Sequence, residues 1–165
     1  MEGWRQNLLE DDARIGALVR SSRRVAVLGI KTERQADQAA FYVARYLDER
    51  GAEVVPVPVY YPEVTEILGK KVYRKVADVP GAVDIVDVFR KPSDVPAHLD
   101  DILAKKPRAV WLQLGIRNDA AAATLAKAGI QVVQDRCLWA EWVSAPMEMR
   151  SGPAAAMART LLSVT

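Results

Sequence analysis

Short apolar runs alternate with amphipathic segments along most of the chain. The run over residues 25–30 is continuously hydrophobic, which is typical of parallel strands buried on both faces. Similar runs recur at intervals that leave room for a helix between them. Together they predict five strands, over residues 25–30, 54–57, 83–89, 109–114 and 130–133.

Apolar residues at helical spacing predict helices between these strands and before the first one. Leu8, Ile15, Leu18 and Val19 predict an N-terminal helix over residues 7–21 that caps the sheet. In the other predicted helices, particular residues mark where the helix begins or ends. Gly51 ends a helix over residues 38–50, Ser93 begins one that buries Val95, Leu99, Ile102 and Leu103, and Asn118 and Gly129 bracket one over residues 119–128.

Strands that alternate with helices predict a doubly wound α/β fold, because short crossovers join parallel neighbours with right-handed connections. We expect a five-stranded parallel sheet in the order 3-2-1-4-5, with helices on both faces. Proline residues in the second strand cannot donate to a ladder, so they argue for an early end or an edge position.

Three segments divide the chain in this interpretation. Residues 1–21 form the capping helix, and residues 22–143 form the sheet domain. Residues 144–165 form a C-terminal extension with a short helix, which Met157, Leu161 and Val164 would dock on the body or on a second subunit.

Composition narrows the possible functions. The chain has 165 residues, 50% of them hydrophobic and 27% charged, which excludes wholesale disorder. Its net charge of +2 is far below the basic excess of a general nucleic-acid binder. One cysteine and one histidine exclude a disulfide framework and most metal or triad chemistry. We find no signal peptide or membrane-length apolar run, and we expect a cytoplasmic protein.

Cationic residues follow four of the five predicted strands. Because parallel strands end on one edge of the sheet, these residues should form one rim, to which the N-termini of the helices add positive dipole ends. A cationic rim on a nearly neutral protein indicates a phosphorylated ligand. Its members are Lys31, Arg34, Arg90, Lys91, Arg117 and Arg136.

The first turn after a strand, from Gly29 to Arg34, limits which phosphates can bind. It has a tight-turn glycine but lacks the other glycines of a dinucleotide fingerprint and the ending of a P-loop. The acidic residue that would hold the ribose of NAD is also absent, because the second strand ends in Pro56, Val57 and Pro58. These absences argue against NAD and leave NADP open.

A series of short motifs resembles a known family. The series comprises Val25-Ala26-Val27-Leu28-Gly29, Ile67-Leu68-Gly69 with Val72-Tyr73, Val86-Asp87-Val88-Phe89-Arg90, Val110-Trp111-Leu112-Gln113 with Gly115, and Asp135-Arg136-Cys137. From residue 25 to about residue 141 the chain resembles the stand-alone CoA-binding proteins, whose domain is similar to the nucleotide-binding part of the succinyl-CoA synthetase alpha subunit. The resemblance implies a Rossmann-like fold that binds CoA or a short acyl-CoA across the strand ends, without catalysis of its own.

The resemblance also implies three groups of binding residues. The first turn would hold the diphosphate, the second and third strand ends would flank the adenosine, and the last two would lie toward the pantetheine arm. Together with Lys91 of the rim, the candidates are Gly29, Ile30, Lys31, Thr32, Arg34, Gln38, Pro56, Val57, Pro58, Phe89, Arg90, Gln113, Gly115 and Arg136.

The chain departs from the family pattern in three places. The usual serine-proline-arginine-serine of the first loop is replaced by a longer segment, residues 31–38, that contains no proline. Pro58-Val59 stands where an asparagine-proline is common, and Trp142 stands where a histidine is usual.

Several residues and functions have competing interpretations. His98 lies inside a predicted helix, where a surface or packing role is expected, and no histidine stands where the related synthetases carry a phosphoryl group. Cys137 is either a small buried hydrophobe or a thiol activated by Arg136.

The alternatives to a CoA-binding module are an NADP- or nucleotide-dependent enzyme on the same fold and a regulatory subunit of an acyl-CoA enzyme. A homodimer or a partner enzyme subunit is possible in each case.

Overall fold

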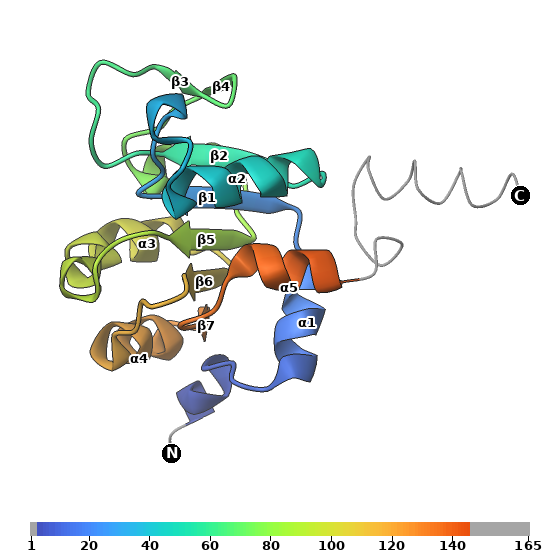
Figure 1. Ribbon diagram of the computed structural model, residues 1–165. Coiled ribbons are helices and arrows are strands. Elements are labelled where there is room, and N and C mark those ends of the chain that lie inside the picture. Colours follow the sequence, from blue (N-terminus) through green and yellow to red (C-terminus); the bar gives the residue numbers. More distant parts are fainter. Residues whose placement is uncertain (1–2, 146–165) are drawn as a thin grey trace, which may run out of the picture.

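The five apolar runs form one parallel sheet, as Figure 1 shows. This computed structural model describes residues 3–145. Each strand pairs in parallel with its neighbours, which confirms the doubly wound α/β fold. The strands of this sheet are β1 (Arg24–Leu28), β2 (Glu53–Val57), β5 (Ile85–Val88), β6 (Ala109–Leu112) and β7 (Gln131–Val133).

The order of the strands is β2-β1-β5-β6-β7, which is 2-1-3-4-5 when the five are counted along the chain. The expected order 3-2-1-4-5 is therefore corrected, since the third strand, β5, pairs with β1 and not with β2. Strand β2 lies at the edge of the sheet, as its prolines predict. The Glu53 N–H and the Val57 carbonyl bond toward β1, so Pro56 faces outward, where no amide hydrogen is needed.

The free side of β2 is occupied by the returning chain. The Tyr73 N–H donates to the Pro56 carbonyl at 3.0 Å. This contact belongs to the long connection between β2 and β5, which contains a small antiparallel hairpin in place of a regular helix. Its elements are β3 (Glu66–Ile67), β4 (Lys70–Lys71) and the 3-10 helix η3 (Val76–Asp78).

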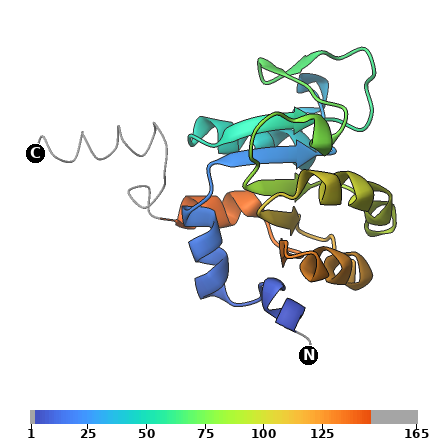
Figure 2. The ribbon, with the colours of Figure 1, turned by 180° about the vertical axis from the view of Figure 1, so that it is seen from behind.

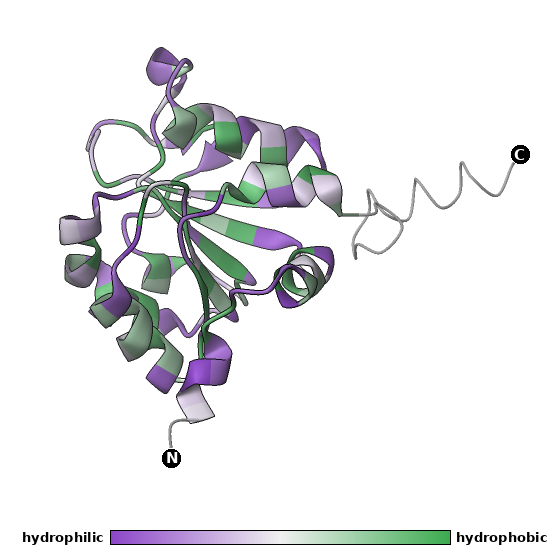
Figure 3. Cartoon of the chain, turned by 60° about the horizontal axis from the view of Figure 1, so that its bottom comes forward, coloured by the Kyte–Doolittle hydropathy of each residue, from purple (hydrophilic) through white to green (hydrophobic). Residues whose placement is uncertain are grey.

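Helices cover both faces of the sheet (Figures 1 and 2). One face packs on α1 (Asp12–Arg20), α2 (Ala39–Glu49) and α5 (Leu138–Ser144). The opposite face packs on α3 (Leu99–Lys105) and α4 (Asp119–Lys127). The strands between the two layers are mainly hydrophobic (Figure 3), because residues of alternating orientation are buried on both sides.

The N-terminal helix is shorter than predicted. Residues Gly3–Asn7 form a 3-10 helix, η1, and α1 begins only after Asp11, whose carboxylate accepts the Arg14 N–H at 2.8 Å. The segment between them runs beside β7, where the Leu9 N–H donates to the Val132 carbonyl at 2.9 Å. The two leucines of this segment thus cover the edge of the sheet and do not continue a helix.

The remaining helix termini follow local chemistry. Asn118 caps α4 as predicted, with its side-chain oxygen accepting the Ala121 N–H at 3.0 Å. After Lys91 the chain forms a 3-10 helix, η4 (Pro92–His98), and α3 starts only at Leu99, because Pro96 has no amide hydrogen for a regular turn. A further 3-10 turn, η2 (Glu33–Gln35), precedes α2.

The C-terminal helix predicted from Met157, Leu161 and Val164 lies outside the described residues. Within residues 3–145, no helix is both long and apolar enough to cross a membrane.

Candidate functional site

The strand order places the switch point of the sheet between β1 and β5. From β1 the chain continues to β2 on one side, and it later returns to form β5 on the other side. Connections that diverge in this way leave a crevice beyond the carboxyl ends of the two strands, where ligands of open α/β sheets bind. Gly29 and Phe89 are the first residues after these ends.

Gly29 lets the two chain segments meet at this point. Its φ angle is +87°, and its N–H donates to the Val57 carbonyl at 2.9 Å. A Cβ atom here would overlap the Phe89 carbonyl oxygen and lie 3.2 Å from Cδ of Arg90. The stem of Arg90 therefore passes directly over the first turn, and only glycine leaves room for it.

Polar side chains of the first turn are ordered by one another. Thr32 caps η2, and its hydroxyl lies 2.7 Å from the Gln35 side-chain oxygen. The Lys31 ammonium donates to the side-chain oxygen of Gln38, the N-cap residue of α2. Ile30 is buried in the core and can offer only its backbone to a ligand. The turn thus presents the Lys31 charge near the positive end of α2, whereas most of its main-chain N–H groups already donate within the protein.

A cavity of about 400 Å³ opens between η2 and the loop that follows β2. Arg34 lies at its wall, and within residues 3–145 its guanidinium forms no ion pair with an acid. Acidic side chains surround it, so the charge of this hollow is mixed. The remaining lining residues are Thr32, Glu33, Gln35, Tyr61, Glu63, Val64 and Glu66.

Arg90 forms the best-ordered cationic group at the switch point. Its side chain is only 15% exposed. The Nε–H donates to Nε2 of His98 at 3.2 Å, and Nη1 donates to the Tyr60 hydroxyl at 3.3 Å. Nη2 lies 3.5 Å from the Asp94 carboxylate, and the guanidinium carbon is 5.4 Å from the centre of the Tyr60 ring. The sequence contained Tyr60 and His98 but gave no sign that both contact this arginine.

Arg74 holds the loop that carries Tyr60. Its guanidinium donates to the carbonyls of Tyr60 at 3.2 Å and of Tyr61 at 3.0 Å. It also donates to the carbonyls of Pro62 at 3.3 Å and of Val64 at 2.6 Å. The four carbonyl acceptors of this exposed arginine are not signalled by the basic run around Arg74, since such runs usually lie on solvated faces without fixed partners.

The other end of the sheet holds the last group of predicted residues. Arg136 follows β7 and donates to Asp12 at 2.8 Å, to Glu141 at 3.2 Å and to the Glu10 carbonyl at 3.2 Å. The hydrogen bond to Asp12 is the main reason that the pKa of Arg136 is raised. Arg117 pairs with Asp119 at 3.1 Å.

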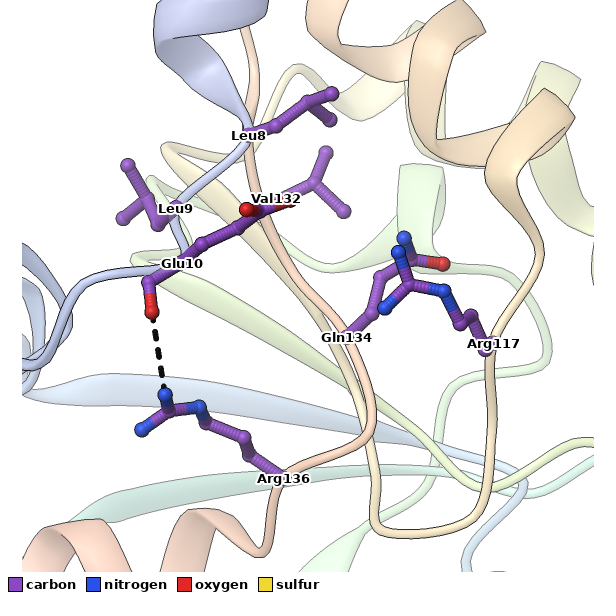
Figure 4. Close-up of a pocket in the computed structure, with 7 residues that line it drawn as sticks. All are labelled: Leu8, Leu9, Glu10, Arg117, Val132, Gln134 and Arg136. Atoms are coloured by element: carbon purple, nitrogen blue, oxygen red, sulfur yellow. Dashed lines mark hydrogen bonds between the residues drawn. The ribbon is translucent and has the colours of Figure 1, made fainter.

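Arg117 and Arg136 line a separate pocket of about 270 Å³ (Figure 4). Strand β7 lies three positions from β1 in the sheet, about 14 Å away at roughly 4.8 Å per strand. The predicted rim therefore divides into two groups. Lys31, Arg34 and Arg90 belong to the switch point, whereas Arg117 and Arg136 belong to the β7 end.

The other predicted residues contribute mainly backbone or packing. Pro56, Val57 and Pro58 are buried, and Phe89 is half-buried against the core. Gln113 is 4% exposed, and its side-chain oxygen accepts the Leu138 N–H at 3.2 Å. Gly115 has a φ of +85° and donates to Asp135 at 2.6 Å, whereas Lys91 is exposed next to Arg90.

Known proteins are similar to most of this chain. The curated "Uncharacterized protein YneT" of Bacillus subtilis (strain 168) is 29% identical over 126 residues, which cover 76% of this chain and 90% of that protein. A solved structure from Thermus thermophilus, cell-free ID.343, is 39% identical with a TM-score of 0.74, and the match covers 82% of this chain and 98% of that one.

A hypothetical protein from Pyrococcus horikoshii OT3 has the same TM-score of 0.74 at 29% identity, over 82% of this chain and 92% of that one. The family model for the CoA binding domain matches residues 23–142. That range contains the whole parallel sheet, the Gly29 turn and the Arg90 cluster. The chain therefore belongs to the CoA-binding domain family.

Proposed function

We propose that this protein binds CoA or a short acyl-CoA in the crevice between the ends of β1 and β5, without catalysis of its own. The observation that carries the proposal is the close approach of the two strand ends, where a Cβ atom on Gly29 would lie 3.2 Å from Cδ of Arg90, so that a cation stands over the first turn at the switch point. Membership of the CoA-binding domain family supports the choice of ligand.

Each part of the ligand has its own proposed contacts. The diphosphate would lie on the turn, against the Gly29, Ile30 and Thr32 backbone and the Lys31, Arg34 and Gln38 side chains. The adenosine would lie between the end of β2 and the end of β5, and the pantetheine arm would pass toward β6. The proposed adenosine contacts are Pro56, Val57, Pro58, Phe89 and Arg90, with Lys91 of the rim beside them. The proposed contacts of the arm are Gln113, Gly115 and Arg136.

The proposal includes a cytoplasmic location, which a single free thiol suits. The proposal is also compatible with a homodimer, or with a partner enzyme subunit that supplies catalytic groups.

Isothermal titration of the full chain with CoA, dephospho-CoA and NADP tests the proposal. We expect CoA to bind most tightly and dephospho-CoA several-fold more weakly, because loss of the 3′-phosphate removes a charge-assisted contact. Arg90→Gln should weaken CoA binding by roughly tenfold, the usual order for a charged hydrogen bond. Arg45→Gln, which removes the same charge from α2, is the matched control and should bind as the wild type does.

Two results would overturn the proposal. One is the absence of CoA binding by the folded wild-type protein. The other is tighter binding of NADP than of CoA, which would favour a nucleotide-dependent enzyme on the same fold.

A further inference from the structure

His98 meets Arg90 at the end of η4 through a bond whose direction fixes the state of the ring. Nε2 of His98 accepts the Arg90 Nε–H at 3.2 Å, so this nitrogen carries no proton. The imidazole is therefore neutral, with its hydrogen on Nδ1. Burial of the ring, and then the positive charge of Arg90, lower the pKa of His98 and favour the same neutral form.

The bond to His98 uses the Nε–H and leaves the two Nη groups for other acceptors. An arginine has five N–H donors and can bind a phosphate through two parallel bonds, either from Nε and one Nη nitrogen or from the two Nη nitrogens. Tyr60 and Asp94 each take one hydrogen from these two nitrogens, at 3.3 and 3.5 Å. One hydrogen then remains on Nη1 and one on Nη2. Both lie in the plane of the guanidinium, which the bond to His98 helps to hold in place.

We propose that His98 is a positioning residue of the ligand site, whose neutral imidazole holds the Arg90 guanidinium so that its two remaining Nη hydrogens face a phosphate of the ligand. The inference rests on the proposed function, since it concerns the same crevice. His98 itself neither contacts the phosphate nor transfers a proton.

Two substitutions separate this role from simple packing. His98→Gln keeps a neutral acceptor oxygen, whereas His98→Phe keeps the ring volume and removes the acceptor. We expect His98→Gln to bind CoA within about threefold of the wild type, and His98→Phe to bind about tenfold more weakly, as a lost hydrogen bond to a charged group implies. In an Arg90→Gln background, His98→Phe should cause no further loss, because the two residues act through one contact.

Nitrogen NMR gives a readout that needs no ligand. The chain contains one histidine, so the imidazole signals belong to His98 without further assignment. We expect the ring of the free protein at pH 7 to show the neutral tautomer with the proton on Nδ1. A charged ring, or a proton on Nε2, would overturn the inference.

The binding results distinguish the two proposals. If the wild type binds CoA and His98→Phe binds it equally well, the positioning role is wrong while the proposed function stands. If His98→Gln is as weak as His98→Phe, the ring contacts the ligand itself and the positioning role is again wrong. If the folded wild type does not bind CoA, the proposed function fails, and with it the role of His98 in the site.

Discussion

Gly29 and Gly129 have nearly the same backbone conformation but very different surroundings. Their φ angles are +87° and +88°. Next to Gly129 a new Cβ atom would meet nothing within 4 Å, whereas at Gly29 it would overlap the Phe89 carbonyl. Alanine at position 129 therefore tests the cost of the left-handed conformation alone, and alanine at position 29 adds a steric clash.

We expect Gly129→Ala to lower the free energy of unfolding by about 1 kcal/mol, the usual cost of this conformation for an L-residue. Gly29→Ala should cost about 2 to 4 kcal/mol, because the clash with the Phe89 carbonyl adds an overpacking cost of roughly 1 to 3 kcal/mol, and it should also weaken CoA binding. Urea denaturation and CoA titration of both variants check this. If the two variants lose the same free energy of unfolding, the close approach of the Phe89 carbonyl to Gly29 does not affect stability.

Asp87 is the one acidic residue that β5 carries into the core. It is 0% exposed, and neither carboxylate oxygen has a hydrogen-bond partner among residues 3–145. Burial without a partner raises the pKa of Asp87 well above its usual value. Its neighbours in the sheet are Val27 and Trp111, which offer no charge to balance an ionised carboxylate.

The raised pKa makes stability depend on pH. In the unfolded chain Asp87 ionises near its ordinary pKa of 3.8, while in the folded protein it retains its proton to higher pH. Stability is therefore lost as the pH rises from that value through the folded-state pKa, by at most about 1.4 kcal/mol per pH unit. Asp87→Asn, which does not titrate, should become progressively more stable than the wild type over this interval. Parallel stability curves from pH 4.5 to 8 would contradict this expectation.

At the scale of elements, the loop after β2 depends on one side chain from outside it. Arg74 binds four carbonyls within residues 60–64, so its removal leaves these acceptors to water. We expect Arg74→Gln to speed amide hydrogen exchange over residues 60–66 by roughly tenfold or more, since local opening becomes easier. CoA affinity should also fall, because Tyr60 is no longer held beside Arg90. Lys75→Gln, a neighbouring exposed cation, is the control, and exchange rates that change equally in both variants would refute a specific role for Arg74.

The sequence predicted the position of a strand or helix correctly where neighbouring residues determine that position. Continuous apolar runs predicted all five strands of the main sheet, and Asn118 with Gly129 predicted both ends of α4. The strand order was not predictable in this way. It depends on where the irregular connection over residues 58–84 returns to the sheet, and nothing in its short turns specifies the side of β1 on which β5 will pair.

For the candidate site, the location of residues at the strand ends was predictable, but their contacts with distant residues were not. Strand ends correctly indicated where Gly29 and Arg90 lie, because all parallel strands end at one edge. Contacts between distant residues were not visible. Arg136 and Asp12 are separated by 124 positions, and their ion pair engages Arg136 at the β7 end of the sheet. Likewise, the packing role expected of His98 did not include its bond to Arg90.

At the scale of the whole molecule, the small net charge conceals a division of cations between the two ends of the sheet edge. The chain carries only +2 overall. The β7 end is neutralised by Asp12, Glu141 and Asp119, whereas the switch point has cations whose ordering partners are chiefly uncharged, namely Tyr60, His98 and Gln38. The cations of the switch point are therefore less closely paired with acids than those of the β7 end, although Glu33, Glu63 and Glu66 line the hollow beside Arg34.

Both outer strands of the sheet are closed to further pairing. Pro56 and the incoming Tyr73 amide occupy the free side of β2, and the Leu9 amide occupies the free side of β7. Unpaired edges are the places where sheets join to one another and where aggregation through strand addition begins. Within residues 3–145, neither outer strand of the main sheet therefore presents an uncovered edge, which disfavours assembly by strand addition to this sheet.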